Sequence, residues 1–297
     1  MTSVVANIQG GLGNQCFIYA AGRALSIATG SDFRLNLDYL LEDCVYRRSL
    51  TLDRFRCVVN VEPASAKLSR MAKRIRYKLF CRAFDRIGNL VLDKKPFRYL
   101  PFPTTWHGDL VLDGYWQSEK YFFDAREQIV DDFQLKDETW TAKDPVAREI
   151  AQADNPVFIH IRSYKEVPGN PYGDCALRMF DYYQRALREM CRRVKAPRFY
   201  VFSDDIELAK SMLQRMKAGE CVKFVEPIEN MIVESQIRDF TLMRKCKHGI
   251  VADSSFSWWA GWLGEQEWIR RGGCPIRMRV NRRVMNDDYW PERWVAI

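Results

Sequence analysis

The second half of the chain alternates short apolar runs with amphipathic stretches, and this alternation is the strongest constraint on its fold. Runs rich in β-branched and aromatic residues predict strands at 156–161, 199–202, 222–225 and 249–251. Apolar residues at helical spacing predict helices at 180–194, from about 206, at 234–246 and from Phe256 to Leu263. Such alternation is typical of a parallel, doubly wound α/β sheet, whose ligands bind beyond the carboxyl ends of the strands.

A strand and a helix also meet near the amino terminus, around a glycine-rich turn. Val4–Ile8 predicts the strand, and helix-spaced apolar residues follow from Phe17. Between them lies Gly10-Gly11-Leu12-Gly13-Asn14-Gln15. Glycine allows a ligand to approach the main chain, and a helix start attracts anions or sugar hydroxyls. The spacing fits neither a P-loop nor a dinucleotide fingerprint, so it indicates a site of unknown ligand or a plain structural turn.

The rest of the first half predicts a second α/β domain. Phe33–Leu37 and the run from Leu110 have strand character, and residues 94–108 predict a loop rich in proline and aromatic residues. Ser118 is the expected N-cap of a following helix. Residues 134–145 are polar and lack a strand pattern, so we place the boundary there, between domains 1–145 and 146–297.

Composition favours a globular protein of the reducing cytosol. Hydrophobic residues make up 47% of the chain, enough for substantial cores. No apolar run approaches the roughly 20 residues of a membrane span, and Met1-Thr2-Ser3 leads directly into a predicted strand without a signal peptide. The nine cysteines are scattered and never spaced as CxxC, which argues against a disulfide framework or a zinc site.

The formal charge of +8 indicates an anionic partner. Much of it lies in residues 67–82, which contain seven basic and no acidic residues, interleaved with apolar ones at helical spacing. A helix of this kind can lie on an anionic membrane surface, or it can pack its apolar face on its own domain. A nucleic-acid-binding protein is the less favoured interpretation, because the charge is concentrated in one segment and no nucleic-acid motif is present.

Polar residues follow three of the predicted strands in the second half. His160 and Arg162 leave the same side of one strand, and an arginine fork suits a diphosphate. The cluster Ser203, Asp204 and Asp205 ends the next strand, where one carboxylate could bind ribose or guanine. The alternatives are an Arg–carboxylate ion pair and a helix N-cap.

A third cluster begins a helix at Ser254, Ser255 and Phe256, just after Asp253. Hydroxyls and unpaired N–H groups at a helix start can hold phosphate, although serine also caps helices routinely. Together the three clusters suit a nucleoside diphosphate. We find no metal-ligand constellation, so charge on the diphosphate would be neutralised by Arg162 and the helix dipole.

Four blocks of the sequence resemble the bacterial and animal α-1,2-fucosyltransferases. They are Gly10–Phe17 with Tyr19–Leu25, Gly114–Phe122, Val201–Asp205, and Cys246–His248 through Ser254–Trp259. Their order and spacing cover most of the chain, and the closing Tyr289–Trp294 also resembles the end of the family.

The resemblance implies a GT-B-like fold with two Rossmann-like domains facing across a cleft. It implies an inverting transfer, without a metal, from GDP-L-fucose to O2 of a galactose or similar hexose. Arg162, after His160, would grip the β-phosphate, and Ser254 and Ser255 would help to hold the phosphates. Asp204 or Asp205 would help to bind the nucleotide. The turn with Gly11, Gly13, Asn14 and Gln15 would face the sugar and the acceptor.

The chain departs from the family pattern after Arg162. The family usually has a second arginine followed by Gly-Asp-Tyr, where this chain reads Ser163-Tyr164-Lys165-Glu166. An inverting transfer needs a carboxylate near the attacking hydroxyl, or the leaving phosphate as base. Glu166 is the candidate by position, and a solvated loop residue is the alternative.

We therefore expect a cytoplasmic enzyme of surface-glycan synthesis, such as O-antigen synthesis. Its acceptor would be an oligosaccharide or a lipid-linked glycan, and residues 67–82 could hold it at the inner face of the membrane. The alternatives are transfer of another GDP-L-sugar, such as colitose or L-galactose, and a catalytically weak relative that only binds GDP or glycan.

Overall fold

The computed structural model describes residues 2–62, 86–87, 89–165, 175–217, 221–228, 234–281 and 288–297. The basic segment 67–82 and the candidate base Glu166 lie outside these residues.

The chain forms two compact units. The first is Met1–Lys136 with Arg283–Pro291, and the second is Asp137–Arg282 with Glu292–Ile297. The division between 136 and 137 lies within the polar stretch 134–145, and residues 137–145, which were expected in the first domain, belong to the second unit. Asp144, which caps helix α5 (Pro145–Gln152), forms a buried ion pair of 2.6 Å with Arg238 of α9 (Ser235–Lys245). This pair ties the start of α5 to the second unit.

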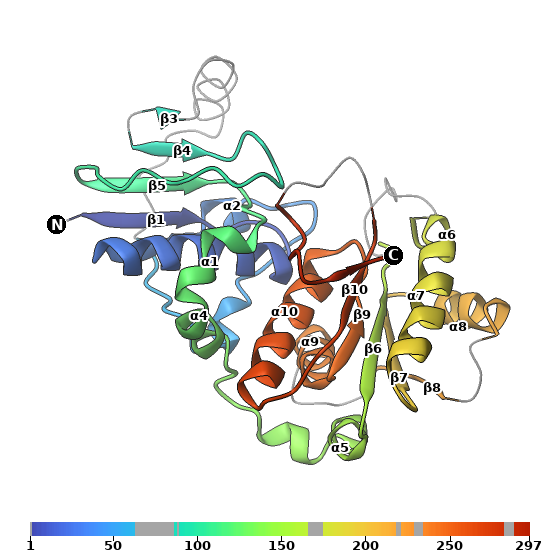
Figure 1. The fold of residues 1–297 in the computed structure, drawn as a ribbon. Coiled ribbons are helices and arrows are strands. Elements are labelled where there is room, and N and C mark those ends of the chain that lie inside the picture. The colour runs from blue at the N-terminus through green and yellow to red at the C-terminus, as the bar shows by residue number, and fades with distance from the viewer. Residues whose placement is uncertain are drawn as a thin grey trace. The chain divides into compact units, whose positions relative to one another are not determined.

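A five-stranded sheet forms the centre of the first unit, in the order β2-β1-β5-β4-β3. The strands are β1 (Ser3–Asn7), β2 (Asp32–Asn36), β3 (Arg86–Ile87), β4 (Leu90–Leu92) and β5 (Asp109–Asp113). All pairings are parallel except that of β3 with β4. Helix α1 (Leu12–Thr29) covers one face of this sheet (Figure 1). The short strands β3 and β4 were not predicted, whereas β1, β2, β5 and α1 lie where the sequence indicates.

The segment after β5 differs from the predicted helix. Ser118 does cap, since its side chain accepts a hydrogen bond from the Lys120 N–H, but the element that it caps is a 3-10 turn. Two such turns succeed one another, Glu119–Tyr121 and Phe123–Ala125, and α4 (Arg126–Asp132) comes only after them. Two further short elements of this unit are α2 (Asp38–Leu41) and the 3-10 turn Leu52–Arg54.

A six-stranded sheet with entirely parallel pairing forms the centre of the second unit, in the order β11-β10-β9-β6-β7-β8. Its strands are β6 (Pro156–Ile161), β7 (Arg198–Ser203), β8 (Val222–Phe224), β9 (His248–Ile250), β10 (Arg277–Arg279) and β11 (Val295–Ala296). The first four of these match the prediction closely. The last two were not predicted, because β10 reads Arg-Met-Arg and has no apolar run, and β11 has only two residues.

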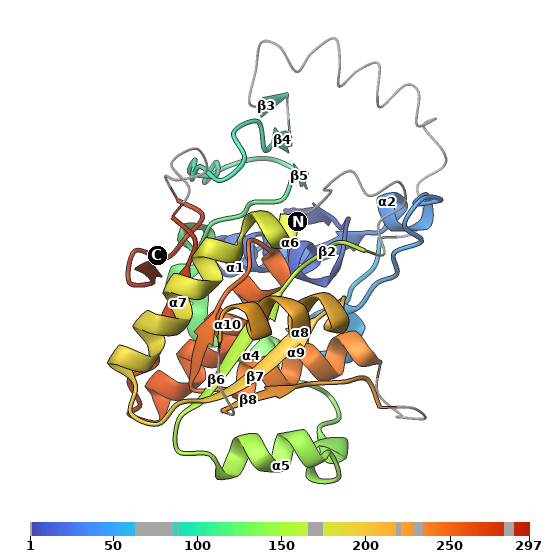
Figure 2. The same cartoon turned by 90° about the vertical axis from the view of Figure 1, so that its right-hand side faces the viewer.

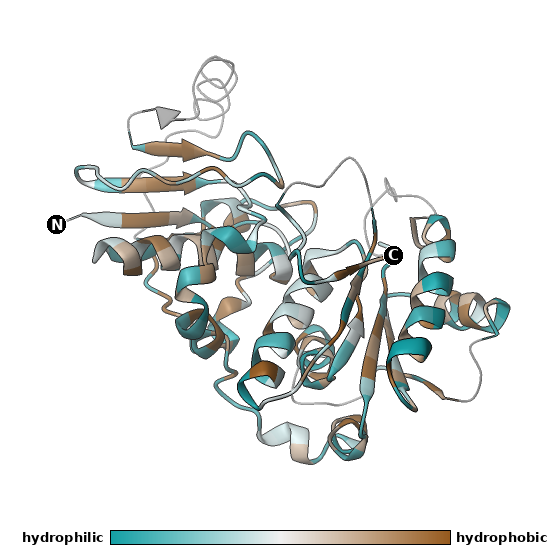
Figure 3. Cartoon of the chain, in the orientation of Figure 1, coloured by the Kyte–Doolittle hydropathy of each residue, from teal (hydrophilic) through white to brown (hydrophobic). Residues whose placement is uncertain are grey.

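Helices cover both faces of this second sheet. Helices α7 (Phe180–Arg193) and α8 (Ile206–Arg215) lie on one face, and α9 and α10 (Ser255–Arg270) lie on the other (Figures 1 and 2). The short helix α6 (Cys175–Arg178) and the 3-10 turn Thr139–Ala142 complete the unit. Apolar residues concentrate on the strands, and the outward side of α7 is hydrophilic (Figure 3). Each unit is thus an α/β layer structure, as predicted, with an entirely parallel sheet in the second unit and a sheet parallel except for the β3–β4 pair in the first.

The aromatic residues of α10 anchor it in the second unit. Trp258, Trp259 and Trp262 are fully buried and contact one another, and Trp258 also contacts Trp294. Glu265 accepts hydrogen bonds from Arg293 at 2.7 and 2.9 Å and from the Trp294 indole at 3.1 Å. The carboxyl-terminal segment thereby fixes the position of α10. Among the described residues, no helix is both long and apolar enough to cross a bilayer.

A glycine in β9 gives a direct test of packing in the second sheet. A Cβ on Gly249 would lie within 2.2–2.8 Å of three atoms of the Phe158 ring, whereas one on Gly261 of α10 would meet its neighbours at 3.4 Å. We expect Gly249→Ala to lower the free energy of unfolding by roughly 1–3 kcal/mol, through overpacking. Gly261→Ala should be neutral or slightly stabilising, because alanine favours helices. Urea unfolding of both variants measures this, and equal stabilities would contradict it.

Candidate nucleotide-binding site

Three strand ends meet at the carboxyl edge of the second sheet. β6 lies between β9 and β7, with Ile159 opposite Ile250 and Ile161 opposite Ser203. The residues just after these strands are therefore neighbours: Arg162 follows β6, Asp204 follows β7, and Ser254 follows β9. The topology thus brings together the three polar clusters that the sequence singled out.

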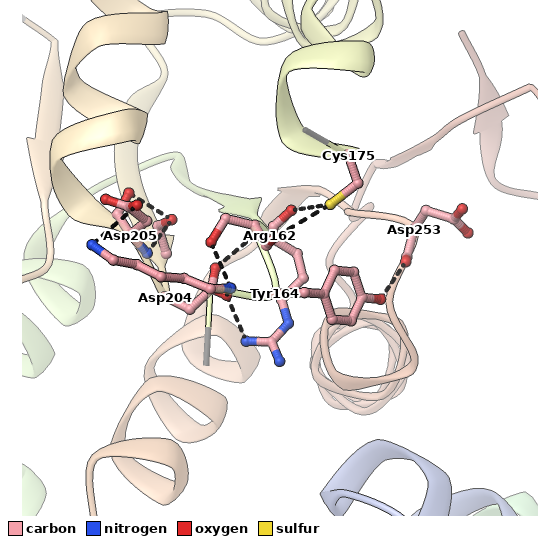
Figure 4. Close-up of polar contacts among 9 residues, drawn as sticks. Arg162, Tyr164, Cys175, Asp204, Asp205 and Asp253 are labelled. Carbon is pink, nitrogen blue, oxygen red and sulfur yellow. Dashed lines mark hydrogen bonds and ion pairs between the residues drawn. The ribbon is translucent and has the colours of Figure 1, made fainter. Parts of the chain in front are cut away.

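The Asp204 carboxylate holds the segment that follows β6. One of its oxygens accepts the Ser163 N–H at 2.8 Å, and the other lies 3.1 Å from the Arg162 guanidinium. The second oxygen also accepts the Lys165 N–H at 3.3 Å (Figure 4). The ion pair that the sequence left as an alternative is therefore present. It orients Arg162, whose side chain keeps 21% of its surface exposed.

Tyr164 connects Arg162 to the turn before α10. Its ring lies against the Arg162 guanidinium, 4.6 Å from the ring centre, and its hydroxyl donates to the Asp253 carbonyl at 3.3 Å (Figure 4). Its φ of 59° lies in the left-handed region that favours glycine, the residue that the resembling family has here. The cation–π contact and the hydrogen bond offset part of that backbone cost. The sequence analysis gave Tyr164 no role, because this residue entered it only as part of the departure from the family pattern.

The residues that depart from the family pattern are integrated into this loop. The Ser163 hydroxyl accepts the Lys165 N–H at 3.2 Å, and Lys165 forms an ion pair of 3.3 Å with Asp205. The Cys175 thiol, at the start of α6, donates toward the Arg162 carbonyl at 3.3 Å. Ser163 and Lys165 therefore stabilise the conformation that presents Arg162.

Ser203 and Asp205 have structural partners of their own. Asp205 caps α8 by accepting the Leu208 N–H at 3.2 Å, and the Ser203 hydroxyl is within 3.0 Å of both the N–H and the carbonyl of Asp205. Of the two acidic residues, Asp205 is thus the cap, while Asp204 is the one bound to Arg162. Neither Ser203 nor Asp205 needs a ligand to satisfy these groups.

His160 is buried beneath the sheet edge. It is 5% exposed, its ring lies against Phe256 of α10, and its Nδ1 is buried without a hydrogen-bond partner among the described residues. Burial, together with the neighbouring Arg162 charge, lowers the pKa of His160 below its usual range. His160 is therefore a neutral imidazole that supports Phe256. The predicted contact with a ribose or phosphate oxygen would require it to be more accessible than this.

The start of α10 offers the features of an anion site. Ser254 is the N-cap residue, but its side chain makes no capping hydrogen bond to the first turn. The first-turn N–H groups of a helix have no partner within the helix and carry its positive dipole end. Ser254 is 8% exposed, and Ser255 and Phe256 are half-buried. The serine cluster thus does not serve mainly as a side-chain cap.

The glycine-rich turn lies in the first unit and is braced by Gln15. Gln15 is 1% exposed, and its side chain donates to the Gly10 and Ser49 carbonyls and accepts the Thr51 N–H. These bonds use both N–H donors of the amide and one acceptor position of its oxygen. The prediction that Gln15 contacts the sugar or acceptor is therefore not supported, because burial and these backbone partners already occupy it.

Asn14 remains accessible at this turn. It is half-buried, and its side-chain oxygen accepts a hydrogen bond from the Gln117 amide at 3.1 Å. The N–H donors of the Asn14 amide take no part in this hydrogen bond. Gly10 has a φ of 76°, and a Cβ there would lie 2.9 Å from the Asn14 amide. Gly11 is the N-cap of α1, with the Arg48 guanidinium nearby, while Gly13 is buried in the first turn. Glycine at position 10 thus leaves the space that Asn14 fills.

No cluster of three or more His, Cys, Asp or Glu side chains suited to a metal ion occurs among the residues that the structure describes.

Solved structures of similar fold define the class of the protein. Fucosyltransferase NodZ from Bradyrhizobium aligns with a TM-score of 0.52 and 14% identity, over 87% of this chain and 92% of that one. A mutant of Arabidopsis thaliana FUT1 in complex with GDP aligns with a TM-score of 0.50 and 15% identity, over 95% of this chain and 71% of that one. The fold is thus of the GT-B-like class expected from the sequence.

Sequence comparison then gives the family. The chain belongs to glycosyl transferase family 11, whose family profile matches residues 50–271. It is 29% identical to an Escherichia coli alpha-1,2-colitosyltransferase over all of this chain and 99% of that protein. It is 26% identical to the E. coli O-antigen biosynthesis glycosyltransferase WbnK, over 88% of this chain and 90% of that one. The family resemblance predicted from the sequence is confirmed.

Acid should destabilise the protein partly through His160. Its folded-state pKa lies below the ordinary value near 6.5, so below about pH 6.5 the unfolded chain binds more protons than the folded one. The free energy of unfolding then falls as the pH falls. We expect His160→Gln to make this loss shallower between about pH 6.5 and pH 4, measured by urea unfolding. The exposed His107, changed to Gln, is the control, and identical slopes in the two variants would contradict the prediction.

Proposed function

We propose that this family 11 glycosyltransferase moves a 6-deoxy-L-sugar from a GDP-linked donor to O2 of a galactose or similar hexose in a surface glycan. L-Fucose is the favoured sugar. The observation that carries the proposal is the position of Arg162 beside the uncapped start of α10, at adjoining strand ends of one parallel sheet. A nucleoside diphosphate needs a cation and N–H donors in this arrangement.

Arg162 would contribute its guanidinium to the β-phosphate. Asp204 and the Tyr164 ring hold two sides of the guanidinium, and a planar fork with five donors has capacity for further acceptors. Ser254, Ser255 and the first-turn N–H groups of α10 would bind the remaining phosphate oxygens. Phe256 would complete this face, supported from below by His160.

Asp204 would help to bind the nucleotide through its hold on the loop after β6, and Ser203 and Asp205 would shape the same edge. The guanine base and the ribose would extend from the phosphates along this edge. The second unit would then be the GDP-sugar-binding domain.

The reaction we propose is a displacement with inversion at the anomeric carbon. The acceptor O2 attacks, its bond to carbon forms, and the bond from carbon to the β-phosphate oxygen breaks, so that GDP leaves. Arg162 and the positive end of α10 would stabilise the charge that develops on the leaving diphosphate, without a metal ion. The proton of the acceptor hydroxyl would go to Glu166 or to the leaving phosphate.

The first unit would be the acceptor-side domain. Gly11 and Gly13 contribute no side chains at the start of α1, and Asn14 would supply a polar contact to the sugar or acceptor. The acceptor would be an oligosaccharide or a lipid-linked glycan. In the second case, the basic residues of 67–82 could hold this cytoplasmic enzyme at the anionic membrane surface. The similarity to the O-antigen biosynthesis glycosyltransferase WbnK supports a surface-glycan acceptor.

A donor panel tests the sugar. With galactose-terminated acceptors and EDTA present, we expect GDP release and a product from GDP-L-fucose, followed by mass spectrometry and linkage analysis. Faster turnover of GDP-colitose would favour colitose, the sugar named in the E. coli relative. GDP binding without turnover of any donor would identify a catalytically weak relative, and a requirement for added divalent cation would contradict the metal-free mechanism.

Asn14→Ala tests the role of the glycine-rich turn. If the turn serves the sugar and acceptor, the variant should lose turnover by roughly 10-fold or more and keep its GDP affinity within about twofold, because a positioned polar contact acts in the transition state. Gln117→Ala is the matched control, since it removes the Gln117–Asn14 hydrogen bond but leaves Asn14 in place. If Asn14→Ala loses turnover and GDP affinity to the same extent, the glycine-rich turn binds the phosphates instead.

A further inference from the structure

Arg279 lies at the same sheet edge as the candidate site, on the opposite side of β9 from Arg162. It is the last residue of β10, which pairs with β9 so that Met278 lies opposite Ile250 and accepts the Val251 N–H. β9 leads into α10, and its other neighbour is β6. The start of α10 is therefore flanked by two strand ends, one followed by Arg162 and the other ending in Arg279.

Both arginines belong to the sheet face that α10 covers. Arg277, two residues before Arg279 on the same strand, reaches α10 and donates from Nε to the Gly261 carbonyl at 2.8 Å. His160, two residues before Arg162, contacts Phe256 of α10. Because side chains alternate along a strand, Arg279 lies on the face of Arg277, and Arg162, the first residue after β6, follows the face of His160.

Arg279, which is half-buried, has fewer partners than the buried Arg277 and Arg238 of this unit, although each of those two also has one buried Nη2 without a hydrogen-bond partner among the described residues. Arg277 donates to three carbonyls, and Arg238 pairs with Asp144. Among the described residues, Arg279 donates only to the neighbouring Val280 carbonyl, at 3.4 Å, and has no carboxylate within ion-pair distance. Its Nε is buried without a hydrogen-bond partner.

A half-buried guanidinium without an acid is costly unless an anion binds to it. Burial lowers the pKa of Arg279, and the one interaction that opposes this shift is with the Tyr182 hydroxyl, a neutral group at ordinary pH. The Asp253 carboxylate, on the turn that leads into α10, also acts on Tyr182, but it is not within ion-pair distance of Arg279. The electrostatics at this position therefore favour an incoming anion.

We propose that Arg279 is a second diphosphate-binding residue, which contacts the phosphates from the side of β10 while Arg162 contacts them from the side of β6. This inference rests on the proposed function. A diphosphate carries more charge than one arginine neutralises, and Arg162 already shares its charge with Asp204. Two arginines on either side of a helix start would supply that charge in the absence of a metal ion.

Titration calorimetry of the full chain with GDP and with guanosine tests the proposal. We expect Arg279→Gln to weaken GDP binding by roughly 10- to 100-fold, the loss typical of a charge-assisted hydrogen bond, and to leave guanosine binding unchanged. Arg279→Lys should bind GDP with intermediate affinity, because lysine keeps the charge and loses the fork. Arg198→Gln, an exposed arginine at the opposite edge of the same sheet, should match the wild type.

Each contrary result has a distinct meaning. If Arg279→Gln binds GDP as tightly as the wild type, this inference is overturned and the proposed function is not affected. Equal losses of affinity for GDP and for guanosine would also overturn it, because they indicate a structural role for Arg279. If Arg198→Gln loses as much GDP affinity as Arg279→Gln, the inference is also overturned, because the effect then comes from the net charge of the protein. Failure of the wild type to bind GDP would refute the proposed function instead. Near-UV circular dichroism of the tryptophan cluster on α10 monitors folding, and Arg279→Lys still tests the contact if Arg279→Gln does not fold.

Discussion

The candidate site depends on one carboxylate. Asp204 accepts hydrogen bonds from the main chain of Ser163 and Lys165 and pairs with the Arg162 guanidinium, so a residue after β7 sets the conformation of the segment after β6. An ion pair of this kind, partly shielded from water, is worth more for the geometry that it imposes than for net stability. Together with the Tyr164 ring, this carboxylate orients the Arg162 guanidinium.

The loop after β6 also contains a residue with a strained backbone conformation. Tyr164 adopts a left-handed backbone conformation and is held there by its contacts with Arg162 and the Asp253 carbonyl. A strained residue persists only where its surroundings determine it, and such residues concentrate at functional sites. Ser163 and Lys165, which depart from the family pattern, add main-chain and ion-pair contacts to the same loop. The departures therefore form an alternative support for Arg162, and their presence is compatible with a working site.

Much of the second unit could be predicted from the sequence, because four of its strands lie in runs rich in β-branched and aromatic residues between amphipathic helices. The same regularity located Arg162, Asp204 and Ser254 at strand ends, and the rule for parallel sheets grouped them. The sequence could not find β10, whose residues Arg-Met-Arg form no apolar run, or β11, which has only two residues, and so it gave no reason to consider Arg279. Nor could it separate the roles of Asp204 and Asp205, because both precede a helix and only the contacts distinguish a cap from an ion pair.

The sequence by itself determined the α/β class, the parallel sheets, the family and the identity of the polar clusters, because these follow from local periodicity and from motifs. Tertiary structure decided what each polar group faces. It buried Gln15 and His160, which the sequence had offered as ligand contacts, and it left the Ser254 side chain free of the capping role that serine often has. The physical reason is that burial and hydrogen-bond partners come from residues distant in the chain. Ser49 satisfies Gln15 and Phe256 covers His160, and neither contact can be inferred from neighbours in sequence.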